Sequence, residues 1–320
     1  GLVACGDKGA PEPASKAAIE RQTSDQARAV EAFAAQLRED NLLAAVQLAV
    51  PPANLEELRA QWTQKMAEDA PSDEERAEYA QQMAKFTAPD AEQALYAELE
   101  PMLVKYETEM AAQMPMMIGM GQGFATQAIN ANEDLDEVQK KQATEVVSAL
   151  GGWLQGVNLA DRELARKSIA IAVKTARALE LPTLDAVRAL DFDQTMGKGG
   201  LVFSGAKEIL ALYGLDINQS LASTKATVVS KDDGAAQVDV AYSLLGKNLN
   251  TRTEMVEVDG RWYGKDTIEQ LVSGLAGGAA ADADDDHADH DAASDDASGT
   301  GHETPAQAGN PDDEPAAPQE

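Results

Sequence analysis

The chain has little of what most enzyme active sites use. Its 320 residues include a single cysteine, Cys5, and all three histidines (His287, His290 and His302) lie among the last 40 residues. A lone cysteine excludes an internal disulfide, and the rest of the chain has no imidazole for a catalytic triad, a proton shuttle or a metal site. We therefore expect no recognisable catalytic site, no cofactor, and a stability that comes from a packed core.

Long apolar runs and clustered positive charge are also missing. No stretch approaches the ~18–20 consecutive apolar residues that span a membrane. Lys and Arg number 26 against 55 Asp and Glu, a net charge of −29, and residues 281–320 hold 13 of the acids and no Lys or Arg. Binding to nucleic acid needs clustered Lys and Arg, so we exclude nucleic acid as a partner.

The most specific motif that is present is Leu2-Val3-Ala4-Cys5, followed by Gly6. It resembles the lipobox of bacterial lipoproteins, in which a branched apolar residue and two small or apolar residues precede the cysteine that receives a diacylglyceryl group. The resemblance implies that residues 1–4 are a signal-peptide remnant, that Cys5 is lipidated, and that residues 5–15 are a linker.

The lipobox resemblance also implies where the protein acts. A cysteine carrying two or more acyl chains would hold the protein stably on a lipid bilayer. The protein would then be anchored to a bacterial cell membrane and face the periplasm. In enterobacterial lipoproteins an Asp after the cysteine signals retention in the inner membrane, so Gly6 favours the outer membrane.

Residues 16–214 are rich in Ala, Glu and Gln and poor in β-branched residues, which predicts a helical domain. We expect one or two helices before Pro51-Pro52 and a last helix from about Val202 to Tyr213. Between them, capping boxes and one N-cap predict further helix starts at Asn54…Glu57, Ser72…Glu75, Thr87…Asp90, Asp134…Glu137, Asn158…Asp161 and Thr183.

A second pattern begins near residue 215. Alternating residues separated by turns predict strands at 226–230, 237–245, 251–258 and 261–263, and a short helix at 267–275. Residues 215–276 are therefore expected to form a small antiparallel meander that packs on the preceding helices. Its Asp259-Gly260 hairpin before Arg261-Trp262-Tyr263 loosely resembles the NTF2-like α+β domains. The fold class is α+β and mostly α, and residues 277–320 are predicted to be a disordered acidic tail.

The methionines of the middle region form one candidate site. Met102, Met110, Met114 and Met117 share one face at helical spacing, and Met116 and Met120 extend the run. We favour packing in the core or against another helix, because methionine fills irregular gaps well. The alternatives are a groove for a partner protein or an apolar ligand, and a Cu(I) site made of thioethers.

Two further segments are weaker candidates. In the tail, His287 and His290 lie among aspartates and could bind Zn or Cu loosely, although a solvated acidic tail is the simpler interpretation. Gly197-Lys198-Gly199-Gly200 lacks the full phosphate-loop pattern, so we expect a loop between two helices.

Together these features predict a membrane-anchored periplasmic lipoprotein with no recognisable catalytic site. We expect a non-enzymatic binding or structural role in the cell envelope, with an envelope protein or an apolar ligand as partner. The alternative is a Cu- or Zn-binding lipoprotein that uses the Met-rich segment (Met114, Met116, Met117 and Met120) or the His/Asp tail.

Overall fold

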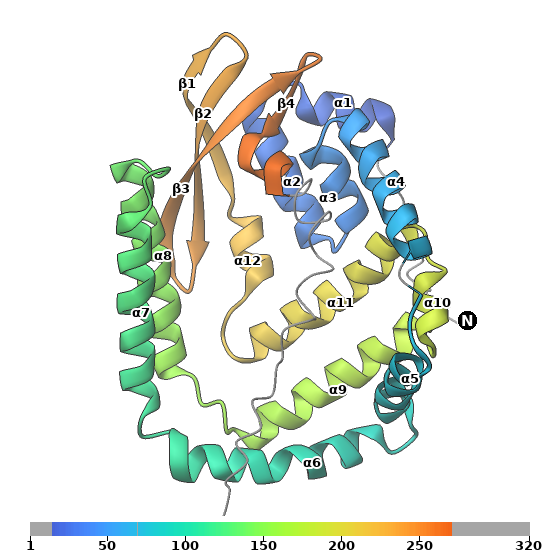
Figure 1. The fold of residues 1–320 in the computed structure, drawn as a ribbon. Helices are drawn as coiled ribbons and strands as arrows, with labels where there is room; N and C mark the ends of the chain where they lie inside the picture. The colour runs from blue at the N-terminus through green and yellow to red at the C-terminus, as the bar shows by residue number, and fades with distance from the viewer. Residues whose placement is uncertain (1–14, 69, 271–320) are drawn as a thin grey trace, which may run out of the picture. The chain divides into compact units, whose positions relative to one another are not determined.

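The computed structural model describes residues 15–68 and 70–270, and it confirms the predicted class: helices come first and an antiparallel sheet follows (Figure 1). The lipobox with Cys5, the predicted tail 277–320 and its histidines lie outside the described residues. None of the described helices is both long and apolar enough to cross a membrane.

The first helices are α1 (Lys16–Thr23), α2 (Gln26–Arg38), α3 (Leu42–Ala49), α4 (Pro52–Glu68), α5 (Asp73–Thr87) and α6 (Ala91–Lys105). Before Pro51 three helices form rather than the predicted one or two. The reason is local capping, because the side chains of Asp25 and Asn41 each accept a backbone N–H and so begin α2 and α3 separately.

The capping boxes predicted for α4, α5 and α6 had different outcomes. The Ser72…Glu75 box is confirmed at the start of α5. Helix α4 begins at Pro52, ahead of the predicted Asn54 box, because proline has no N–H to leave unpaired in the first turn. The predicted Thr87 start is wrong: Thr87 ends α5 with its hydroxyl donating to the carbonyl of Met83, and α6 begins at Ala91.

The later helical elements are a π-helix η1 (Tyr106–Met110), α7 (Met114–Ala131), α8 (Glu137–Gly156), α9 (Arg162–Leu179), α10 (Leu184–Arg188), α11 (Phe192–Leu212) and α12 (Ile217–Ala222). Thr183 caps α10 as predicted. Two starts were predicted too early: Asp136…Gln139 is the capping box of α8, and Asp161 is itself the N-cap of α9.

The prediction of a loop at residues 197–200 is wrong, because these residues lie inside α11. A capping box between Asp191 and Gln194 starts α11 ten residues before the predicted Val202. Gly200 and Gly205 allow other parts of the chain to pack closely against α11. A Cβ on Gly200 would collide with the backbone carbonyl of Asp40, and one on Gly205 would collide with the hydroxyl of Thr175.

A buried lysine holds the turn between α2 and α3, where Asp40 adopts a left-handed backbone with φ of 61°. The ammonium of Lys207 on α11 donates to the carbonyls of Leu37 (2.8 Å) and Arg38 (3.0 Å) and to the side chain of Asn218 (2.6 Å). It also lies 2.8 Å from the Asp40 carboxylate. Lys207 therefore donates to two carbonyls at the end of α2 and helps to hold the turn that follows.

The predicted meander is present as β1 (Lys225–Asp232), β2 (Ala235–Leu244), β3 (Lys247–Val258) and β4 (Arg261–Gly264), joined in the order β1-β2-β3-β4 with antiparallel pairing. Leu245-Gly246 and Asp259-Gly260 both have positive φ, as two-residue hairpin turns require. A helical segment follows, of which the structure describes residues 265–270.

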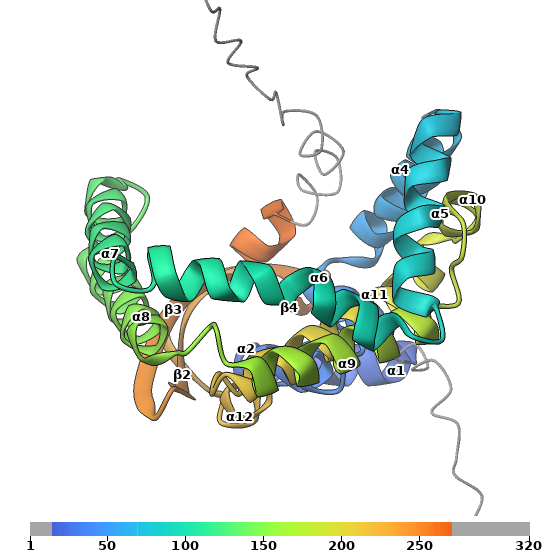
Figure 2. The same cartoon turned by 90° about the horizontal axis from the view of Figure 1, so that it is seen from below.

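The sheet packs on helices, as predicted. One core cluster joins Ala29 of α2 to Val238, Met255 and Trp262 of the sheet. A second joins Ala149 of α8 to Leu244 and Leu249 at the other end of the strands, and a third lies among α3, α4 and α11. This packing leaves α7 with a single main neighbour, α8, and the two helices run side by side (Figures 1 and 2).

Candidate functional site

The four candidate methionines of the Met-rich segment all lie on α7, whereas the other candidates (Cys5, His287 and His290) lie outside the described residues. Helix α7 follows the π-helix η1 and begins at Met114 with Pro115 in its first turn. A bidentate ion pair between Glu107 of η1 and Arg162 of α9, with both oxygens 2.7 Å from the guanidinium, fixes the segment that leads into α7. This hydrogen bonding lowers the pKa of Glu107.

One side of α7 packs on α8. Met114, Ile118, Gln122, Ala125 and Ile129 recur at helical spacing and are half-buried. The Gln122 amide lies against α8, donates to the Val147 carbonyl at 3.4 Å, and fills the space that Gly151 leaves open. Within residues 15–68 and 70–270, no helix or strand other than α8 packs along α7.

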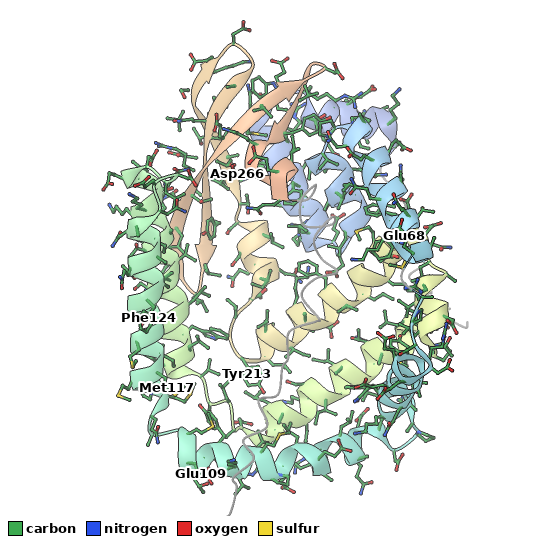
Figure 3. The ribbon with its side chains drawn as sticks, in the orientation of Figure 1. Glu68, Glu109, Met117, Phe124, Tyr213 and Asp266 are labelled. Atoms are coloured by element: carbon green, nitrogen blue, oxygen red, sulfur yellow. The ribbon has the colours of Figure 1, made fainter. Side chains whose placement is uncertain are left out.

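That exposed side carries four large apolar side chains, which we call the methionine face: Met116, Met117, Met120 and Phe124. Their exposed fractions are 64%, 50%, 55% and 66%, and no residue of α7 is buried. Figure 3 shows Met117 and Phe124 on α7. The favoured prediction that the methionine run packs in the core or against another helix is therefore wrong for this face, and Met102 and Met110 are exposed as well, whereas Met114 is half-buried on the side against α8.

The methionine face lies in an uncharged part of the chain. No Asp, Glu, Lys, Arg or His occurs from Met110 to Asn132, although a quarter of all residues are charged. Glu107 and Glu109 precede this stretch, and Glu133 and Asp134 follow it. Helix α7 therefore presents an apolar surface without the charged residues that normally cover the solvent side of a helix.

A second apolar surface, the three-helix groove, lies among α5, α9 and α11. It has a volume of about 380 Å³, and each helix contributes residues at helical spacing: Tyr79, Gln82, Met83 and Phe86 from α5; Ala172, Thr175, Ala176 and Leu179 from α9; Val202, Gly205, Ala206 and Ile209 from α11. The Tyr79 hydroxyl donates to the Leu181 carbonyl at 2.9 Å, which holds one wall in place. Burial raises the pKa of Tyr79.

The sequence analysis missed the three-helix groove. Its signal was the spacing of the apolar residues on each of the three helices, but that spacing also describes an ordinary packed helix. The three apolar faces meet at one place because α9 contacts both α5 and α11, and this packing is seen only in the structure.

The titratable groups of the described part serve structural contacts. The pKa of Glu75 is lowered by hydrogen bonds from the backbone and hydroxyl of Ser72 at the start of α5. The pKa values of Arg59 and Arg252 are raised by their pairs with Asp193 and Asp239. In residues 15–68 and 70–270 no three His, Cys, Asp or Glu side chains are grouped so as to hold a metal ion.

No family model matches this chain, and no curated protein or solved structure matches it either. The lipobox and NTF2-like resemblances therefore stay predictions that rest on the residues that carry them. Any function assigned to the chain must come from its own motifs and surfaces.

Proposed function

We propose that this protein is a lipid-anchored, non-enzymatic binding protein of the bacterial cell envelope. The lipobox at Leu2–Cys5 supports anchoring through an acylated Cys5, with the body facing the periplasm and Gly6 favouring the outer membrane. The observation that carries the binding role is the methionine face, because large apolar side chains gathered on one exposed helix face mark an interaction site.

The methionine face suits an apolar partner. Thioether side chains are flexible and polarisable, so a surface made of them adapts to partners of different shape. It offers no charged group that a polar substrate could recognise. The proposed activity is therefore binding, and the partner is an apolar surface.

The anchor is tested by metabolic labelling with an alkyne fatty acid in a bacterial host that processes lipoproteins. The parent protein should be labelled and should fractionate with membranes, whereas a Cys5→Ala variant should not be labelled and a smaller fraction of it should be recovered with membranes. Equal labelling of the two proteins would contradict the anchor.

The binding surface is tested by a photo-crosslinking amino acid placed at Gln127, an exposed position of α7 close to the methionine face. Adducts should form there and should be lost when the face carries Met116→Gln, Met117→Gln and Met120→Gln. The matched control is the same probe at Gln237, which is exposed on β2. Equal adduct yields at the two positions would refute the proposal.

A copper-binding role is the second candidate. Met116 and Met120 are one helical turn apart, Met117 is adjacent, and all three side chains are exposed. Soft thioether ligands suit Cu(I). This role needs the sulfur atoms, whereas the binding role needs only apolar side chains.

A further inference from the structure

We propose that α7 lies flat in the surface of a neutral lipid bilayer, with the methionine face among the acyl chains. This inference rests on the proposed function, because it names the apolar partner that the methionine face binds.

The charge pattern fits a bilayer surface. The uncharged stretch from Met110 to Asn132 is bounded by Glu109 on one side and Glu133 on the other. The 18 residues of α7 extend over about 27 Å at 1.5 Å per residue, so an apolar helix lies between two acidic ends that stay in water. Within the described residues α8 covers one side of α7 and the methionine face lies on the other, so we infer that α7 lies on the bilayer with that face inserted.

The size of the methionine face argues against a stable protein partner, including a second copy of the chain. Four side chains that are 50–66% exposed offer roughly 500 Å² at most. A stable protein interface buries about 800 Å² on each partner. Two copies would also bring together two bodies that each carry a net charge of −29.

The chemistry of the methionine face also argues against a stable protein partner. The residues that contribute most binding energy in protein interfaces are enriched in Trp, Tyr and Arg, and such interfaces make about one hydrogen bond per 100–200 Å². The methionine face has none of these three residues, and its side chains have no hydrogen-bond donor and only the weak thioether acceptors of methionine. Acyl chains require neither a fixed shape nor hydrogen bonds, so they suit such a surface.

The acidic body determines which lipid is bound. Interfacial helices that prefer anionic lipids carry Lys and Arg on their polar face, and α7 carries neither. Anionic headgroups would repel the rest of the chain. A neutral bilayer is therefore preferred, and an anchor at Cys5 would keep α7 close enough to the bilayer for weak insertion to suffice.

The experiment is vesicle flotation of the full-length chain with Cys5→Ser, so that no acyl anchor contributes. The probes are phosphatidylcholine vesicles and vesicles that also contain phosphatidylglycerol. The test variant carries Met116→Gln, Met117→Gln and Met120→Gln; these side chains face solvent and glutamine is a comparable helix former, so the fold is retained. The matched control carries Val228→Thr and Val229→Thr, two exposed positions on β1.

We expect the Cys5→Ser chain to bind neutral vesicles, the glutamine variant to bind about tenfold less, and the valine control to bind like Cys5→Ser. Phosphatidylglycerol should weaken binding. The inference is overturned if the Cys5→Ser chain does not float, if the glutamine variant floats equally well, or if binding requires the anionic lipid. Protein adducts at Gln127 without vesicle binding would refute the lipid partner and leave the proposed binding role intact.

Discussion

Replacing the buried Lys207 by methionine should destabilise the fold strongly. Only 4% of the Lys207 side chain is exposed, and its ammonium satisfies two carbonyls at the end of α2, the Asn218 side chain and the Asp40 carboxylate. Methionine has a similar length and can fill the space, so the change removes the charge and its hydrogen bonds with little loss of volume.

The size of the effect follows from what would be left unpaired. Removing one member of a buried charge pair costs about 3–5 kcal/mol, because the other member stays behind without a partner. Here the Asp40 side chain is 29% exposed, and its contact with Lys207 is an ion pair without hydrogen-bond alignment. Water can partly solvate the carboxylate, so we expect the lower end of the range, about 3 kcal/mol.

Urea unfolding followed by circular dichroism measures this cost. With a slope near 3 kcal/mol/M, a loss of about 3 kcal/mol lowers the midpoint by about 1 M. Lys174→Met is the matched control, because Lys174 is exposed and its pair with Glu208 spans 3.4 Å, and it should cost under about 0.5 kcal/mol.

A double-mutant cycle separates the ion pair from the helix cap. Asp40→Asn removes the charge and keeps a residue type that tolerates the left-handed backbone at this turn. We expect a coupling energy with Lys207→Met of about 0.5–3 kcal/mol. If Lys207→Met stays within about 0.5 kcal/mol of the parent, Lys207 does not hold the α2–α3 turn and the reasoning fails.

Three other predictions concern helix packing, pH and metal. Gly200→Ala should lower the free energy of unfolding in urea by about 1–3 kcal/mol, because its Cβ meets a backbone carbonyl. Gly197→Ala, in open space on the same helix, should raise the free energy of unfolding by about 0.5–1 kcal/mol. Equal effects of the two substitutions would exclude the close packing at Gly200. Because the pKa of Glu75 is lowered by folding, its stabilisation is present above the unfolded pKa of about 4.3 and is lost as the pH falls through the folded value. The stability difference from Glu75→Gln should therefore shrink in urea titrations below about pH 4.3, and a constant difference would contradict this. Replacing the three methionines of the methionine face by leucine should leave vesicle binding unchanged. Cu(I) binding is measured by competition with a chromogenic chelator, and binding by the parent chain that is lost in the leucine variant would support the copper role.

Most of the fold could be predicted from local signals, because caps and turns act over a few residues. The Ser72…Glu75 box, the Thr183 cap and the Asp259-Gly260 turn each work through their own backbone. The errors in helix starts arise where neighbouring acids compete. Asp134 and Asp136 both offer an N-cap oxygen, and the structure uses the second because Gln139 completes its box.

The burial of the Met-rich segment could not be predicted in the same way. Apolar residues at helical spacing form the same pattern whether the helix lies in a core or faces an apolar medium. The outcome depends on how many elements pack around the helix, which is a property of the whole fold. Only α8 packs along α7 in the described structure, so the side with Ile118 is covered and the side with Met120 is exposed.

The absence of charged residues is more informative than the apolar spacing, because it distinguishes a helix side that faces apolar material from one that faces water. A helix that is half-covered by the fold and half in water normally carries charged residues on its outer side, as α9 does with Arg166, Lys167 and Lys174. Helix α7 has none on any side, which fits a helix surrounded by apolar material. Because the described part of the fold supplies that material along one side only, the uncharged stretch from Met110 to Asn132 supports the proposal that the methionine face lies in a bilayer surface.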